Sequence, residues 1–287
     1  MNQRERIVEL ITDSGLDRVK QSLIELLADS VRLNSEPCPD DEIGIGSSKL
    51  GGCPDLPVGV EWPTYGGRPL NLIAQLNLAD VQPYEPAQRL PREGFLSFFY
   101  DALEQPWGFD PQDKGRFKVI YSEPGLQLQR LPEPEELSEQ GNFGAMRLSS
   151  QLDTTFPSID TIEVVQLDLN VDEDELYWEL TDQIAGSKDE TLIHRMFGHP
   201  DTIQNAMQLE CQLVTNGIYC GTSDGYDDAR AAELAPGSSD WKLLLQVDSE
   251  EGIGTIWGID GRLYFWIREQ DLAARNFDHV WVIQQCT

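Results

Sequence analysis

The stretch LNLIAQLNL at residues 70–78 decides the fold class, because its apolar side chains recur at every second position. Leucine or alanine occupies each even position, whereas asparagine or glutamine occupies three of the four odd ones. A period of two is typical of a strand that buries one face and leaves the other exposed to water. The stretch therefore predicts a half-buried β-strand, with Ile73 as the exception on the polar face.

Other segments rich in aromatic and β-branched residues extend the β pattern along the chain. They are GFLSFFYD (94–101), RFKVIY (116–121), TIEVVQLDL (161–169), LECQLVTN (209–216), WKLLLQVD (241–248), GTIW (254–257), RLYFWI (262–267) and HVWVIQQC (279–286). An amphipathic helix is expected over DEDELYWELTDQIA at 172–185, and a brief one near 269–274. The balance predicts a β-rich α+β fold.

The amino terminus predicts two helices. Apolar residues recur there at three- and four-residue steps, on one helical stripe formed by Leu16, Val19, Leu23, Leu26, Leu27 and Val31. A shorter helix with Ile7 and Ile11 precedes this stripe, and Ser14-Gly15 separates the two. We expect a helical hairpin over residues 1–35, followed at 36–69 by an ordered loop region rich in proline and glycine.

Two parts of the chain can be laid over each other. Aligning LNLIAQLNL and GFLSFFYD with KLLLQVD and GRLYFWI places Gln75 on Gln246 and Gly94 on Gly261. In this alignment the apolar positions, the glycine of the turn and the aromatic residues of the strands coincide. This agreement favours two β units built alike. We expect these units to close around a shared interior that contains Leu72 and Leu263.

A second similarity does not follow this alignment. WGFD at 107–110 returns as WGID at 257–260, but the first copy follows its strand pair and the second lies between its strands. Either the two copies are independent turns, in which tryptophan anchors to the core and glycine supplies a positive φ, or the halves are intertwined.

The charge is strongly acidic, with 50 acidic against 21 basic residues and a net charge of -29. Residues 133–190 hold sixteen of the acids and only Arg147 and Lys188 as bases. Such a charge repels nucleic acid and anionic lipid, so neither is expected as a partner. The acidic segment is interpreted as a solubilising face or as a docking surface for a basic protein.

The cysteine content and the hydropathy of the sequence indicate its cellular compartment. The five cysteines are odd in number and form no C-x-x-C, which disfavours a disulfide framework. No apolar run approaches the length of a membrane span, and residues 1–15 lack the apolar centre of a secretory signal. We expect a cytoplasmic protein with reduced thiols.

Motifs for metal or phosphate chemistry are incomplete, so no metal or cofactor is predicted. His194 and His199 stand five residues apart, and Gly198 and Pro200 interrupt the helix that a pair of metal ligands would need. Cys211 and Cys220 do not complete any known spacing of zinc ligands. Residues 168–179 place acids and an asparagine at EF-hand positions, but the sixth position lacks glycine. The glycines of GIGSSKLGG do not follow the phosphate-loop order.

The strings SKLGGCPDLPVGVEWP, PLNLIAQLNL, LPREGFLSFFYD, WGFDPQDKGRFKVIY, HRMFGHPDTIQ and LLLQVDSEEGIGTIWGIDGRLYFWIREQDL, spread over 47–286, resemble the YwqG-like family of bacterial proteins, a domain of unknown function. The resemblance implies one mostly antiparallel α+β domain with internally related halves and a cytosolic location. It implies no catalytic residues. Within residues 1–287 we distinguish the hairpin (1–35), a first β unit (36–130), an acidic strand and helix insert (131–200) and a second β unit (201–287).

Two functions remain open. The first is a non-enzymatic protein-binding module whose acidic surface engages a basic partner, for example a toxin or an enzyme that it neutralises. The alternative is an enzyme or small-ligand binder with a cleft between the β units. The residues expected to line that cleft are Gln75, Gln246, Asp110, Asp260, Trp107, Trp257 and His199.

Overall fold

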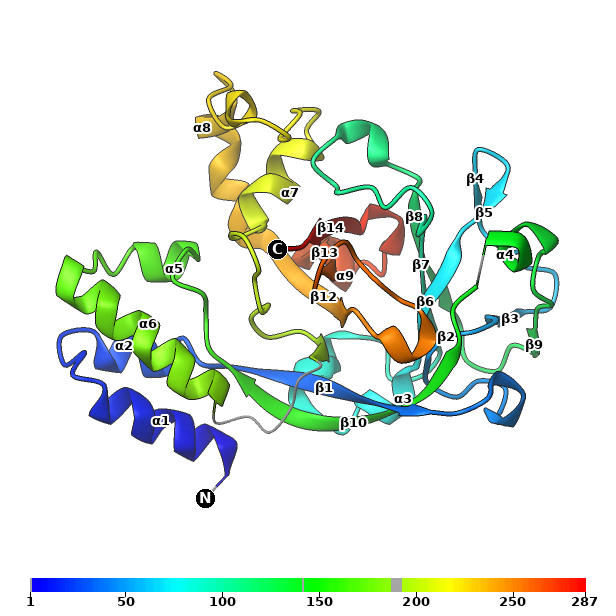
Figure 1. The fold of residues 1–287 in the computed structure, drawn as a ribbon, viewed down its shortest axis with the longest axis horizontal. Coiled ribbons are helices and arrows are strands. Elements are labelled where there is room, and N and C mark those ends of the chain that lie inside the picture. Colours follow the sequence, from blue (N-terminus) through cyan, green and yellow to red (C-terminus); the bar gives the residue numbers. More distant parts are fainter. Residues whose placement is uncertain (1, 141, 187–192) are drawn as a thin grey trace.

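The computed structural model describes residues 2–140, 142–186 and 193–287, and it is an α+β structure built on one large antiparallel sheet (Figure 1). The strands are β1 (Ala28–Pro37), β2 (Lys49–Gly51), β3 (Asp55–Pro57), β4 (Thr64–Tyr65), β5 (Arg68–Pro69), β6 (Asn71–Asn77), β7 (Phe95–Tyr100), β8 (Phe117–Ser122), β9 (Leu128–Arg130), β10 (Ala145–Thr155), β11 (His194–Met196), β12 (Trp241–Asp248), β13 (Arg262–Arg268) and β14 (Trp281–Gln285). The α-helices are α1 (Gln3–Asp13), α2 (Lys20–Glu25), α3 (Leu78–Val81), α4 (Glu135–Gln140), α5 (Ile162–Val165), α6 (Val171–Gly186), α7 (Gln208–Val214), α8 (Ala231–Leu234) and α9 (Glu269–Ala273).

The centre of the sheet is the pair β1 and β10. These long strands run antiparallel over ten residue pairs, from Ala28 opposite Thr155 to Pro37 opposite Met146. The full strand order is β14-β13-β12-β11-β1-β10-β2-β6-β7-β8. The sheet therefore has two flanks of five strands each, one from β14 to β1 and the other from β10 to β8. Next to the central pair, β1 also pairs with the short strand β11, and β10 with the short strand β2.

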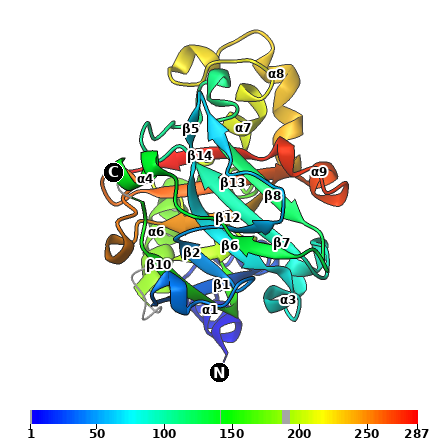
Figure 2. The same ribbon diagram turned by 90° about the vertical axis from the view of Figure 1, so that its right-hand side faces the viewer.

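The two flanks of the sheet share local irregularities. The pairing of β6 with β7 shifts register between Leu72 and Ala74, and the pairing of β12 with β13 shifts between Leu243 and Leu245. An extra residue at such a bulge bends the strand and increases its twist. Both flanks therefore curl, and Figure 2 shows strands β6 to β8 lying across strands β12 to β14.

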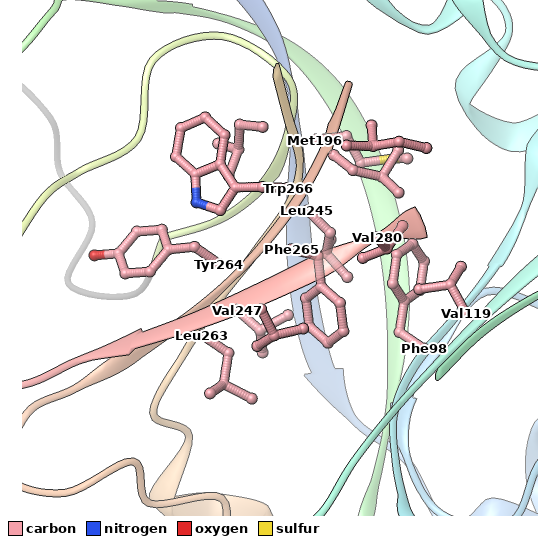
Figure 3. Packing of buried hydrophobic residues seen from close by; sticks show 14 of the residues in the cluster. Phe98, Val119, Met196, Leu245, Val247, Leu263, Tyr264, Phe265, Trp266 and Val280 are labelled. Atoms are coloured by element: carbon pink, nitrogen blue, oxygen red, sulfur yellow. The ribbon is translucent and has the colours of Figure 1, made fainter. Parts of the chain in front are cut away.

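The main core lies where the two flanks meet. Phe98 of β7 packs edge-on against Phe265 of β13, with ring centroids 5.2 Å apart, and Figure 3 shows these two rings between the flanks. Phe117 of β8 and Trp281 of β14 meet in the same way at 5.1 Å, which brings together the two end strands of the sheet order. The sheet thus nearly closes on itself.

The strand predicted from LNLIAQLNL exists as β6, but it is not half-buried. Residues 71–76 are all buried, because the main core covers one side and a small cluster of Leu56, Leu70, Leu72 and Phe99 covers the other. The expectation that Leu72 and Leu263 share one interior is wrong for the same reason. Leu263 belongs to the main core, whereas Leu72 faces the small cluster behind the sheet.

A second core holds the helices α1, α2, α5 and α6 together beside the sheet (Figure 1). Tyr177, Leu180 and Ile184 of α6 are buried there, as the amphipathic pattern predicted. Arg18 joins this group by pairing with Glu173 and by donating to the carbonyl oxygens of Leu167 and Asp168.

Four sequence predictions are wrong. The helix predicted over residues 16–31 ends with α2 at Glu25 and β1 starts at Ala28, so within the described part of 1–35, assigned to a helical hairpin, only α1 and α2 are α-helical. Pairing with β10 outweighs the helical period because Val31 and Leu33 then reach the main core. The strands predicted at 161–169 and 209–216 are instead the short helix α5 and the helix α7, and 254–257 forms only one bridge, between Glu250 and Thr255.

We predict that Phe265→Ala lowers the free energy of unfolding by about 3–5 kcal/mol, because it leaves a cavity opposite Phe98 at the junction of the flanks. Urea denaturation followed by circular dichroism measures the effect. Ile259→Ala is the control, since Ile259 is 69% exposed and its truncation should change stability by less than about 0.5 kcal/mol. Equal stability of the two variants would contradict this account of the core.

Candidate functional site

Gln75 is a structural residue of the sheet. Its side-chain oxygen accepts a hydrogen bond from the backbone N–H of Asp55 at 2.7 Å, and its nitrogen donates to the Ser47 carbonyl oxygen and to the Asp55 carboxylate, both at 3.0 Å. Arg130 pairs with the same carboxylate at 2.8 Å. The amide is fully buried, so it holds the loop before β3 and presents nothing to a ligand.

Gln246 makes the same set of contacts on the other flank. Its oxygen accepts from the backbone N–H of Asp201 at 2.9 Å, and its nitrogen donates to the Ile193 carbonyl oxygen at 2.9 Å and to the Asp201 carboxylate at 3.1 Å. Arg195 pairs with Asp201 at 2.6 Å. Gln246 is also fully buried, so the two aligned glutamines each anchor an aspartate loop and do not face each other across a cleft.

The two WG stretches lie side by side. Gln105, just before WGFD, donates to the carbonyl oxygen of Ile256 at 3.0 Å and accepts from the backbone N–H of Gly258 at 3.2 Å. Trp257 is fully buried against Tyr100, whereas Trp107 is 37% exposed. Sequence reasoning missed Gln105, which carries no motif of its own.

The remaining residues of the predicted cleft lie in separate places. Gly108, within WGFD, has φ 88°, and an added Cβ would meet the Val282 carbonyl oxygen at 2.0 Å, so glycine is required where this stretch crosses β14. Asp110 caps a 3₁₀ turn by accepting from the backbone N–H of Gln112, and Asp260 is exposed in a turn with φ 49°. His199 lies in the groove described below.

The histidines and acids that resembled metal ligands have structural partners. His194 Nδ1 accepts from the backbone N–H of Asp248, and His199 Nε2 donates to the Leu26 carbonyl oxygen at 2.7 Å. Asn170 and Glu173, from the EF-hand-like run, cap the start of α6 through reciprocal hydrogen bonds. Among the described residues, no group of three His, Cys, Asp or Glu side chains is arranged to hold a metal ion.

A groove of about 760 Å³ opens between the α5 region and the α7–α8 region. Its walls come from Asp160 to Val165 on one side and from Gln208, Leu209, Ser238 and Ser239 on the other. The groove is also lined by His199, Leu243, Trp266, Glu85, Arg89, Lys242 and Glu269. Figure 1 shows α5 and α7 facing each other above the central strands.

The groove is acidic and partly apolar. Five acidic side chains line it (Asp29, Glu85, Asp160, Glu163 and Glu269) against two basic ones (Arg89 and Lys242). Ile162 is 45% exposed and Val165 is 62% exposed along the α5 wall. Exposed apolar side chains beside carboxylates are typical of a protein-binding surface.

Two buried polar atoms of the groove have no hydrogen-bond partner among the described residues. They are the indole nitrogen Nε1 of Trp266, a donor, and Oδ2 of Asp160, an acceptor. The other oxygen of Asp160 accepts from the Ser158 hydroxyl. Figure 3 shows the Trp266 ring on the side of β13 opposite Phe265 and away from the junction of the flanks. Both atoms are closed to solvent in this structure, so a molecule in the groove would reach them only if neighbouring side chains moved.

His199 is neutral in the groove. Burial lowers its pKa, and its Nε2 proton is held by the Leu26 carbonyl oxygen. Of the residues predicted for a site, His199 alone belongs to this groove, while Trp107 lines a separate pocket. Asp160, Ile162 and Trp266 were missed, because only the tertiary structure brings α5 opposite α7.

The molecule is thus an α+β protein with one antiparallel sheet that nearly closes on itself and an acidic groove beside it. No helix within the described ranges is long and apolar enough to cross a bilayer. Residues 48–286 match the model of the family described as a domain of unknown function, DUF1963, and the chain belongs to that family. A comparison with curated proteins finds no match. The matched range starts at Ser48, after α1, α2 and β1.

We predict that Gln246→Leu and Gln75→Leu each lower the free energy of unfolding by about 1–3 kcal/mol, because each leaves a backbone N–H and a backbone carbonyl oxygen without their side-chain partner. Urea denaturation of each variant tests this, with exposed Gln88→Leu as the matched control. If the buried and exposed substitutions had the same effect, the anchoring role of the glutamines would be wrong.

Proposed function

We propose that this protein is a binding module that holds a basic polypeptide segment of a partner in the groove between α5 and α7. The observation that carries the proposal is the lining of this groove, which has five acidic side chains against two basic ones and exposes Ile162 and Val165 of α5. An extended segment that carries lysine or arginine together with apolar side chains matches such a lining.

The charge of the groove supports a basic segment. Asp160, Glu163 and Glu269 lie on two sides of the same cavity, and lysine or arginine side chains of the segment would pair with them. Ile162 and Val165 would cover apolar parts of the segment. The overall charge of -29 adds long-range attraction, which speeds encounter with a cationic partner and weakens as salt increases.

The acidic segment of the sequence contributes to this surface in part. α5 supplies one wall of the groove, and α6 displays Asp172, Glu175, Glu179 and Asp182 to solvent around Trp178, which is 56% exposed. An exposed aromatic side chain on a helix that also exposes several carboxylates is suited to contact a basic protein. α6 therefore extends the surface that such a partner can use beyond the groove.

We also infer that the two flanks are related halves that exchanged their first strands. In this arrangement β1, β2, β6, β7 and β8 correspond in order to β10, β11, β12, β13 and β14. Support comes from the matched glutamine–aspartate contacts, the matched bulges, and the central pairing of β1 with β10. Because β1 pairs with β11 and β10 with β2, the halves would be intertwined.

Two narrower assignments are part of the proposal. The strings that resemble the YwqG-like bacterial proteins favour membership of that branch of the family. The five cysteines are all free thiols, which agrees with action in the reducing cytoplasm.

The proposal predicts site-specific capture of a basic partner. A photo-reactive phenylalanine analogue at position 162, in the groove wall, should cross-link a protein from host lysate at low salt, and the yield should fall as salt rises. The same analogue at position 259, which is exposed and outside the groove, is the control. Mass spectrometry should identify a basic protein, cross-linked through a lysine- or arginine-rich segment.

Variants then test the contacts with the captured partner. Glu163→Lys with Glu269→Lys should weaken binding about tenfold, since each exposed charge contributes up to about 1 kcal/mol. Glu9→Lys with Glu61→Lys changes the net charge equally outside the groove and should leave affinity nearly unchanged. An acidic partner, or equal capture at both positions, would overturn the proposal.

A further inference from the structure

A second pocket of about 480 Å³ lies on the other side of the segment that leads into α7. Its lining shares Asn205 and Tyr226 with the groove but otherwise comes from different residues. Aromatic and amide side chains predominate: Trp107, Phe109, Tyr226, Gln204, Asn205, Gln284 and Gln285. Glu210 is the one charged side chain among the residues that line it.

Glu210 is a buried carboxyl without a cation. It lies in the first turn of α7, is 9% exposed, and its Oε2 accepts from the Tyr226 hydroxyl at 3.3 Å. Among the described residues no lysine, arginine or histidine pairs with it. Arg268, which contacts α7, donates instead to Gln212 and Thr215 and lies over the ring of Trp241. A buried carboxylate is normally paired, so this one is free to take an external cation.

The aromatic side chains that line the pocket also suit a cation. Trp107 is 37% exposed and Tyr226 is 38% exposed, so both present ring surface at the pocket. A guanidinium or ammonium group is attracted to such faces. Outside the pocket, Asp224 and Asp227 are exposed on the same loop as Tyr226, which makes the approach to the pocket negative.

We propose that this pocket binds the guanidinium or primary ammonium group of an organic cation, with Glu210 as its counter-ion and Trp107 and Tyr226 as flanking rings. The cation can belong to a free small molecule or to an arginine or lysine side chain of a protein. The site adjoins the groove, with which it shares Asn205 and Tyr226, but it does not depend on the function proposed for the groove.

Binding should increase with pH. Burial raises the pKa of Glu210 to about 7, and the cation binds the ionised form. The groups that face Glu210 are Tyr226 and Cys220 on the neighbouring loop, Cys211 on α7, and Arg268 beyond it. Burial raises the pKa of the Tyr226 hydroxyl and of both thiols, so among these groups Glu210 alone changes charge near neutrality. Affinity should therefore be about tenfold higher near pH 8 than near pH 6.

Calorimetric titration of the full chain with n-butylguanidinium tests the proposal, with neutral n-butylurea as the ligand control. We expect the guanidinium to bind, the urea not to bind, and the carbon-13 shift of the Glu210 carboxyl to report ionisation as the guanidinium binds. Glu210→Gln is isosteric with the protonated acid and should fold, but it should lose most of the affinity and all of its pH dependence. Trp107→Ala should weaken binding several-fold.

The matched control is Glu233→Gln, which neutralises an exposed acid of α8 outside the pocket and should leave binding unchanged. An arginine-containing peptide as a second probe separates the two sources. Binding of free butylguanidinium supports a small-molecule ligand, and binding of the peptide alone, lost in Glu210→Gln, supports a side chain of a partner. Absence of binding by both probes, equal binding of the urea, or affinity independent of pH would overturn the proposal.

Discussion

The pairing of β1 with β10 is the interaction on which the rest of the structure depends. It joins the two flanks of the sheet through ten consecutive residue pairs. β1 comes from the start of the chain and β10 from its middle, so the sheet forms only when segments more than a hundred residues apart meet. Such a non-local pairing has a large entropic cost, which the core formed by both flanks must offset.

Buried polar contacts fix the positions of the loops next to the short strands β3 and β11. A glutamine in a packed sheet would be costly alone, yet Gln75 and Gln246 each satisfy a backbone N–H, a carbonyl oxygen and a carboxylate. Basic side chains then neutralise both aspartates. Because a misplaced partner would leave several buried groups unsatisfied, these contacts select one register for the loops that precede β3 and follow β11.

The acidic character of the protein is unevenly distributed in space as well as in sequence. Buried carboxylates such as Asp55 and Asp248 are paired with arginine, so the excess negative charge lies at the surface. The groove and the Glu210 pocket differ from this rule, because each contains an acidic oxygen that lacks a basic partner in the described structure. They flank the same segment before α7, which makes that segment the centre of both proposed binding sites.

Local sequence pattern was sufficient to locate the outer strands and the helix α6. Strands β6, β7 and β13 could be found because their segments are rich in apolar, aromatic and β-branched residues, and α6 because its apolar residues recur at helical spacing. The alignment of Gln75 with Gln246 could be found in the same way. The stretch at 209–216 was misread, because short apolar runs fit either a strand or a helix.

By itself, then, the sequence determined the α+β class, the outer strands β6 to β8 and β12 to β14, and the strongly acidic charge. Only the tertiary structure decided that residues 28–37 form the central strand, that β6 is covered on both sides, and that Asp160 and Trp266 line the same groove. The physical reason is that burial of one segment by another, and the hydrogen bonds left open between them, depend on residues distant in sequence that no local period records.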